Sequence, residues 1–168
     1  MKKAKAFTLV EILVVVVLLG VIAVIVIPTV ANSTTSAKDS ALAVDLQLLR
    51  RVILVYKSQH LEVGPGYPNG DTTQAPTEQA FIDQTTMASN TNGQTAAIGT
   101  PGFERGPYLM KIPVNPFDGK NTVEVLADGQ AFPAVADNSH GWIYKAETSE
   151  IRADNTGTDQ NGKQYYDY

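Results

Sequence analysis

The chain has no cysteine among its 168 residues. This absence excludes disulfide cross-links, cysteine-based zinc sites and a thiol nucleophile. Cations are also scarce, because 13 lysines and arginines stand against 17 aspartates and glutamates, for a formal charge of −4. A protein that binds nucleic acid needs a basic surface, so this charge balance indicates no nucleic-acid partner.

Charge is missing from a long segment near the N-terminus. Between residues 7 and 30 the only ionisable side chain is Glu11, and residues 12–27 are all apolar or glycine. A helix of this length can cross a hydrocarbon layer of about 30 Å. Three lysines precede the segment and the next cation is Lys38. The positive-inside rule therefore predicts a cytoplasmic N-terminus and a body on the other side of the membrane.

Three interpretations of this segment are open on its chemistry. It could be a secretory signal cleaved before Asn32, or an uncleaved signal anchor. Neither explains Glu11, because an ionisable group inside a membrane helix costs about 2.5 to 3.5 kcal/mol. In the third interpretation, cleavage between Ala6 and Phe7 creates an α-amine one helical turn from Glu11. In a packed array of such helices, the carboxylate of one subunit can then pair with the amine of its neighbour.

Residues 7–11 read Phe-Thr-Leu-Val-Glu, after a short basic leader and before the apolar run. This arrangement resembles the signal of type IV prepilins and type II secretion pseudopilins. The resemblance implies that a prepilin peptidase cuts the chain after Ala6 and methylates the new amino group of Phe7. It also implies that Glu11 directs assembly. The family usually has glycine before the cut, where this chain has Ala6.

A second helical segment follows the apolar run. Apolar residues recur at spacings of three and four in residues 38–61, and they include Leu42, Leu46, Leu49, Ile53 and Tyr56. A helix from residue 7 to about residue 60 would be about 80 Å long, more than a bilayer needs. We expect this helix to form the spine of a filament subunit.

Two residues are expected to weaken that helix, Gly20 and Pro28. Proline removes one backbone hydrogen bond and clashes with the preceding turn. The resemblance points to the same place, since prepilins commonly have a kinking proline in the long helix.

The remaining residues predict a small headpiece. Thr77 is expected to cap a short helix over residues 77–87, and residues 88–102 are typical of a loop. Closely spaced prolines predict an extended connector between residues 106 and 119. Strands are predicted at residues 123–126, 142–144 and 151–153.

The predicted fold is therefore α+β and pilin-like, with a long N-terminal helix packed on a small antiparallel sheet. The helix has a membrane-spanning half and an amphipathic half. The expected divisions are a leader (1–6), a transmembrane assembly helix (7–31), an amphipathic helix (32–62) and a periplasmic headpiece (63–168).

The headpiece carries a weaker resemblance to the major pseudopilin of type II secretion. It rests on Tyr67-Pro68, on the proline-rich run at residues 106–117 and on Gly-Trp-Ile-Tyr at residues 141–144. No paired cysteines frame a C-terminal loop, as they do in many type IV pilins, and this absence also favours a pseudopilin.

No catalytic constellation stands out, so we expect no enzyme. His60 and His140 are interpreted as surface or capping residues, because Ser139-His140 lacks the context of a nucleophile. Oxygen-bearing residues near Asp154 and Asp159 would suit calcium, and the resemblance implies a calcium site in this C-terminal region. Their spacing is not that of an EF-hand, so the residues alone predict no cofactor, and calcium stays the one candidate.

The sequence thus predicts a structural subunit of a type II secretion pseudopilus that supports protein export. The resemblance implies several partners: further copies of the chain, minor pseudopilins, an inner-membrane assembly platform, prepilin peptidase and membrane lipid before assembly. The expected location is the inner membrane, with a single span, and then a periplasmic pseudopilus. The alternatives are a type IV pilus subunit for motility, adhesion or DNA uptake, or a signal-anchored periplasmic binding module or enzyme.

Overall fold

The computed structural model of the chain describes residues 8–168, without the side chains of residue 25 and residues 28–32. The chain divides after Ala37 into two compact units. Helix α1, Leu9–Gln59, contributes residues to both units. The predicted long helix is therefore confirmed, and it continues through Gly20 and Pro28 without ending at either residue.

Within the second unit, α1 buries the apolar side that its sequence predicts. Leu42, Leu46, Leu49, Ile53 and Tyr56 are each at most 1% exposed. The helix ends in two residues with left-handed backbone, Leu61 and Glu62, and the Glu62 amide donates to the Lys57 carbonyl (3.1 Å). This turn closes the helix because it gives one of the last free carbonyls a donor.

Two short elements follow α1. A 3₁₀ helix, η1, covers Pro68–Gly70, and α2 covers Glu78–Thr86. Thr77 has extended backbone and its hydroxyl accepts a hydrogen bond from the Ala80 amide (3.2 Å). This is the N-cap that the sequence predicts for α2.

The segment predicted as a loop at residues 88–102 contains a small antiparallel hairpin. Strand β1, Ala88–Ser89, pairs with β2, Thr95–Ala96. Asn90 shapes the turn between them, since its side-chain oxygen accepts from the amides of Asn92 and Gln94. Two-residue strands leave no alternating apolar pattern, so the sequence gives them no signal.

The main sheet has three strands in the order β3-β4-β5, and they cover Val123–Leu126, Trp142–Lys145 and Glu150–Ala153. Strands β4 and β5 form the predicted antiparallel hairpin. Strand β3, however, runs parallel to β4, with Val123 opposite Trp142. The expectation that all strands are antiparallel was therefore wrong for β3. The long connection at residues 127–141 lets the chain return to the end of the sheet where β3 began.

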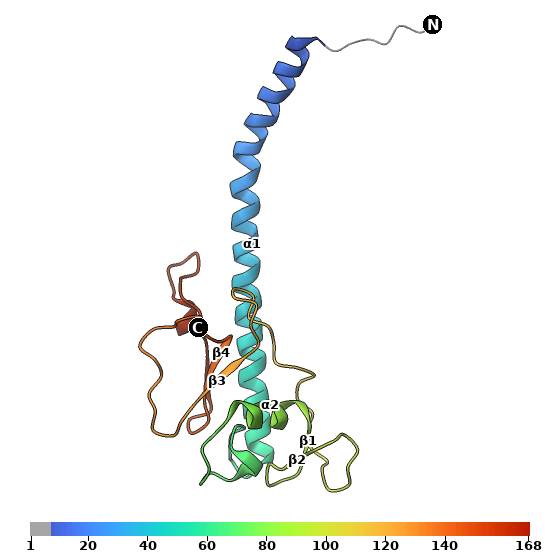
Figure 1. Cartoon of the computed structure of the whole chain (residues 1–168), viewed down its shortest axis with the longest axis vertical. Coiled ribbons are helices and arrows are strands. Elements are labelled where there is room, and N and C mark those ends of the chain that lie inside the picture. Colours follow the sequence, from blue (N-terminus) through green and yellow to red (C-terminus); the bar gives the residue numbers. More distant parts are fainter. Residues whose placement is uncertain (1–7) are drawn as a thin grey trace, which may run out of the picture. The chain divides into compact units, whose positions relative to one another are not determined.

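The headpiece core lies between α1, α2 and the sheet (Figure 1). Trp142 and Tyr144 from β4, Phe81 from α2 and Ile151 from β5 are all fully buried there. A smaller apolar cluster on β3 and β4 combines Leu126 and Ile143 with residues of the connection and of the C-terminal 3₁₀ helix η2, Tyr165–Asp167. The predicted α+β, pilin-like fold is confirmed.

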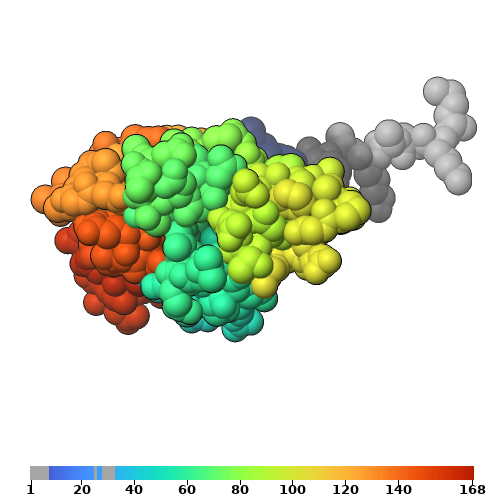
Figure 2. All heavy atoms as spheres, turned by 90° about the horizontal axis from the view of Figure 1, so that it is seen from below, coloured from blue at the N-terminus to red at the C-terminus, as the bar shows by residue number. Residues whose placement is uncertain are grey.

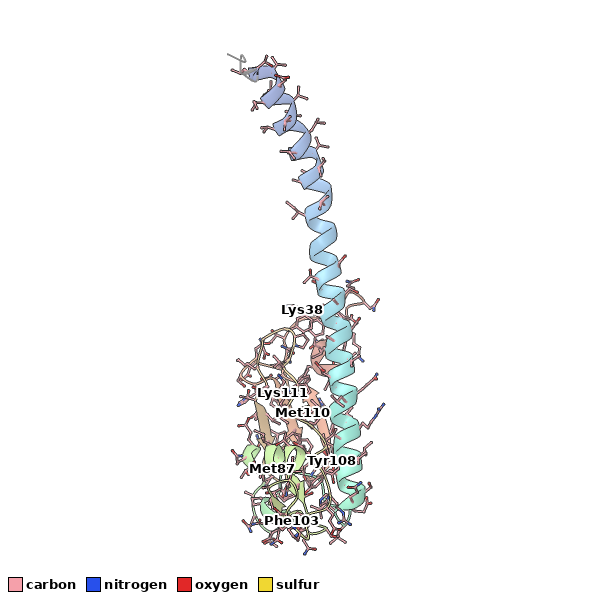
Figure 3. The ribbon with its side chains drawn as sticks, turned by 90° about the vertical axis from the view of Figure 1, so that its right-hand side faces the viewer. Lys38, Met87, Phe103, Tyr108, Met110 and Lys111 are labelled. Atoms are coloured by element: carbon pink, nitrogen blue, oxygen red, sulfur yellow. The ribbon has the colours of Figure 1, made fainter. Side chains whose placement is uncertain are left out.

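The predicted connector at residues 106–119 contains no helix or named strand. Tyr108 packs beside the C-terminal part of α1 (Figure 3). Its hydroxyl donates to the Gln59 side-chain oxygen (2.7 Å), and its ring meets the ring of Tyr56 edge-on. These contacts hold the connector against the helix.

Candidate assembly site

The N-terminal end of α1 is closed by a capping box. Thr8 precedes the first helical residue, and its hydroxyl accepts a hydrogen bond from the Glu11 amide (3.2 Å). In return, the Glu11 carboxylate accepts bonds from the Thr8 amide (2.8 Å) and the Thr8 hydroxyl (2.9 Å). The reciprocal bonds satisfy amides that the helix itself leaves without acceptors.

Oε2 of Glu11 accepts both of these hydrogen bonds, and Oε1 accepts none from any described residue. The side chain is exposed in the single chain. Glu11 therefore has two capacities: one oxygen fixes the start of the helix, and the other is open to a donor from outside. A cationic donor would bind best, because a bond to an ionised partner is about twice as strong as a neutral one.

Sequence reasoning singled out Glu11 but missed its partner Thr8. The signal was present, since a threonine three residues before a glutamate at the start of an apolar helix is the pattern of a capping box. Ala6 and Phe7 lie outside the described residues, so cleavage and methylation there stay predictions. The pairing of Glu11 with a neighbour's amine stays a prediction too.

The apolar side chains that follow this site are uncovered. Each described leucine, isoleucine and valine side chain between Leu9 and Ile27 is at least 48% exposed. The space beside Gly20 is also open, because a Cβ atom placed there would meet no atom within 4 Å. Such a continuous apolar surface marks a region that another apolar partner covers. Among the residues whose side chains are described, no helix meets the length and hydropathy required for a membrane span.

The two calcium candidates occupy different environments. Asp154 is fully buried, and its carboxylate accepts hydrogen bonds from the amides of Asp137, Asn138 and His140 and from the Ser139 hydroxyl. Asp154 therefore fastens the connection between β3 and β4 to the sheet.

Asp159 lies in the C-terminal tail and is partly exposed. It accepts bonds from the amides of Lys163 and Asn161 and from the Tyr168 hydroxyl. Within the described residues, no group of three or more acidic, histidine or cysteine side chains is placed to hold a metal ion. Calcium binding stays a prediction.

Ser139, His140 and Asp154 do come together, but not as a catalytic relay. The Ser139 hydroxyl lies 2.9 Å from Nδ1 of His140 and 3.2 Å from the Asp154 carboxylate. Asp154 accepts from the backbone amide of His140 rather than from its ring. A triad needs the carboxylate to orient the imidazole, and here it orients the serine and the loop backbone.

His60 is buried, contrary to a surface position, although it does cap the end of α1. Its ring stacks on Tyr56 with a centroid distance of 3.7 Å, and its two nitrogens lie 2.7 Å from the Tyr56 carbonyl and 2.9 Å from the Ser89 hydroxyl. Burial lowers the pKa of His60 from its ordinary value, with Arg105 contributing in the same direction. A neutral His60 thus ties α1 to strand β1.

Comparison with known proteins agrees with these features. Residues 1–27 match a family described as the prokaryotic N-terminal methylation motif. The chain is 26% identical over 129 residues to type II secretion system core protein G of Aeromonas hydrophila, which covers 77% of each protein. It is 27% identical over 132 residues to core protein G of Pseudomonas aeruginosa, which covers 79% of this chain and 80% of that protein.

Core protein G of Klebsiella pneumoniae is 25% identical over 130 residues. No solved structure matches the chain. The resemblance to prepilins and secretion pseudopilins that the first residues predict is confirmed by the family match and by these relatives.

Proposed function

We propose that the chain is a structural subunit of a type II secretion pseudopilus and not an enzyme. Prepilin peptidase cleaves it between Ala6 and Phe7, methylates Phe7, and the mature chain polymerises through the N-terminal half of α1. The observation that carries this proposal is Glu11. It is the only charge in an otherwise apolar helix start, and it lies inside a segment that matches the N-terminal methylation motif.

The capping box gives Glu11 a role before assembly. Burying a carboxylate in apolar surroundings raises the free energy unless hydrogen-bond donors satisfy its oxygens. Thr8 provides two such donors, its amide and its hydroxyl. On assembly, the methylated amine of Phe7 in a neighbouring subunit binds the remaining oxygen. The pair forms only when the two helices are in register, so one charge per subunit fixes the stagger of the filament.

The exposed apolar surface of the helix supports two successive environments for it, first the membrane and then the filament. Before assembly the segment at residues 7–31 lies in the inner membrane, with the N-terminus in the cytoplasm and the headpiece in the periplasm. After assembly the same surface packs against neighbouring copies of the helix. Minor pseudopilins and an inner-membrane platform are the further partners of this proposal, and the relatives named core protein G favour a secretion pseudopilus over a type IV pilus.

Mass spectrometry of the membrane-extracted chain tests the processing step. We expect an N-terminus at N-methylated Phe7. An intact Met1 would support a signal anchor, and a start at Asn32 would support a secretory signal, so either result contradicts the proposal. Deletion of the chain in its own cell should also block protein export and leave surface motility and DNA uptake unchanged.

The role of Glu11 is tested with two substitutions. Glu11→Ala removes both the cap and the charge, whereas Glu11→Gln keeps an oxygen that accepts from Thr8 and removes only the charge. We expect both variants to enter the membrane and both to be missing from filaments. Normal filaments from Glu11→Gln would show that the cap, rather than the charge, is what assembly requires.

A further inference from the structure

A small cavity lies at the end of the headpiece where α1 ends. Its volume is about 30 Å³, and its walls come from three segments: the end of α1, the 3₁₀ helix η1 and the turn between β1 and β2. Figure 2 views the molecule from this end, and it shows the teal end of α1 next to the green residues that follow it and the yellow-green residues of the hairpin. The cavity therefore lies where three parts of the headpiece meet.

Two glycines allow these segments to come close together. Gly70 and Gly93 both have left-handed backbone, and a Cβ atom on Gly70 would overlap the carbonyl oxygen of Asn92. A Cβ atom on Gly93 would lie 2.9 Å from the hydroxyl oxygen of Tyr56. Since glycine has no side chain, both residues line the cavity with backbone atoms alone. The Tyr56 hydroxyl therefore faces a wall of polar backbone.

This hydroxyl is a buried polar group that no described residue satisfies. Tyr56 is 1% exposed, and its hydroxyl forms no hydrogen bond with any residue that the structure describes. Burial raises the pKa of Tyr56 far above its ordinary value, so the hydroxyl is neutral and can both donate and accept. Buried polar groups of folded proteins are nearly always hydrogen-bonded, either to protein or to ordered water. The hydroxyl thus requires a partner within the cavity.

The walls of the cavity suit a small neutral partner. Among the described residues, no carboxylate lines it, and both ring nitrogens of His60 already face other groups, the Tyr56 carbonyl and the Ser89 hydroxyl. A metal ion would therefore find neither a charged ligand nor a free imidazole nitrogen.

Water fits the same space and chemistry. A water molecule needs about 10 to 15 Å³ and two to four polar partners. The Tyr56 hydroxyl is one partner, and the backbone carbonyls of the glycine wall can supply the others, because each carbonyl oxygen has two lone pairs.

We propose that this cavity holds an internal water molecule bound to the Tyr56 hydroxyl. The water bridges the last turns of α1 to the backbone of η1 and of the β1–β2 turn. It adds to the link between α1 and β1 that His60 and Ser89 make directly. The site is independent of the proposed polymer, since all of its residues belong to one headpiece.

Oxygen-17 relaxation dispersion of the full chain in detergent tests the site, because it detects the oxygen of long-lived internal waters and not exchanging hydroxyl protons. Tyr56→Phe keeps the ring that stacks on His60 and removes only the hydroxyl. We expect this variant to lose the contribution of one water molecule. Tyr108→Phe is the matched control, because it removes a neighbouring hydroxyl that does not line the cavity, and it should keep that contribution.

Amide exchange tests the bridge that the water makes. In Tyr56→Phe the amides of residues 91–93 should exchange about fivefold faster, since the turn loses one net hydrogen bond to α1. In Tyr108→Phe they should exchange as in the unaltered chain. Faster exchange without the loss of a water would mean that the hydroxyl binds the turn directly, and it would overturn the proposal.

A crystal structure of the unaltered chain provides a test that needs no variant. We expect density for a water about 2.5 to 3.0 Å from the Tyr56 hydroxyl oxygen. A protein atom in that place would overturn the site, and so would equal relaxation dispersion in the unaltered chain and in Tyr56→Phe. Loss of one water in both tyrosine variants would contradict its assignment to this cavity. None of these results bears on filament formation, which the processing and Glu11 experiments test separately.

Discussion

The two halves of helix α1 have the same secondary structure and opposite surroundings. Leu18 in the first half is 57% exposed, while Leu46 in the second half is 1% exposed. The second half is stabilised by its own headpiece, because one side of the helix is removed from water there. The large apolar side chains described between Leu9 and Ile27 are exposed in the single chain. In the proposed function, lipid and then neighbouring copies cover them, so that one helix would serve folding at one end and assembly at the other.

Truncating one leucine in each half tests this comparison most strongly. Leu46→Ala should lower the free energy of unfolding of the headpiece by about 2 to 5 kcal/mol, since it leaves a cavity in the core. Leu18→Ala should leave that free energy unchanged and reduce filament formation. Denaturant unfolding of the full chain in detergent, followed through the single and fully buried Trp142, measures the first effect. Equal losses in both variants would contradict the division between the halves.

The next largest effect is expected at Asp154. Asp154→Ala should destabilise the headpiece by about 3 kcal/mol, because three backbone amides and the Ser139 hydroxyl lose their acceptor. Asp167→Ala, at an exposed aspartate, is the control and should change little. The same denaturant titration applies, and amide exchange should increase at residues 137–140. Full stability of Asp154→Ala would show that the connection between β3 and β4 holds without this anchor.

A smaller, pH-dependent effect is expected at His60. Because its pKa is lowered in the folded chain, the unfolded chain binds the proton more readily. Stability should therefore fall as the pH drops below about 6.5, the ordinary value, and level off below the folded pKa. His60→Gln should remove this part of the pH dependence. Unfolding curves between pH 5 and 8 provide the measurement, and an unaltered slope in His60→Gln would assign the dependence to another group.

The smallest effect is expected at Thr8. Thr8→Ala removes the hydroxyl of the capping box and should cost about 1 kcal/mol at the start of the helix, without affecting the headpiece. Thr8→Ser keeps the hydroxyl and should behave as the unaltered chain. Amide exchange at residues 9–12 in detergent micelles reports the local opening. Equal protection in Thr8→Ala would mean that Glu11 alone closes the helix.

Most elements of the fold were predictable because their signals are local. The apolar spacing from Leu42 to Tyr56 defined the buried side of α1, and Thr77 marked the start of α2. The hairpin of β4 and β5 followed from two short β-rich runs and a turn. The direction of β3 was not predictable, because it depends on where residues 127–141 lead the chain rather than on the strand itself.

The candidate-site residues also differ in how far the sequence predicts their roles. Glu11 stood out from the sequence because a lone charge in an apolar run demands an explanation. His60 was expected to be a surface or capping residue, and it does cap α1, but its burial was not predicted, since a single residue at a helix end carries no signal of what packs over it. Asp154 was considered for its oxygens, whereas in the structure those oxygens bind loop amides from residues 137–140.

The sequence by itself determined the apolar helix, the lone carboxylate within it and the absence of disulfide cross-links. These are properties of residue type and spacing along one helix, and they do not depend on the rest of the chain. Only the tertiary structure decided that β3 runs parallel to β4, that His60 binds Ser89 of β1, and that Asp154 accepts hydrogen bonds from loop amides. Each of these depends on which backbone groups and surfaces meet in space. The free energy of such contacts depends on their geometry and on the exclusion of water. Neither can be inferred from the residue types and spacing within one helix or strand.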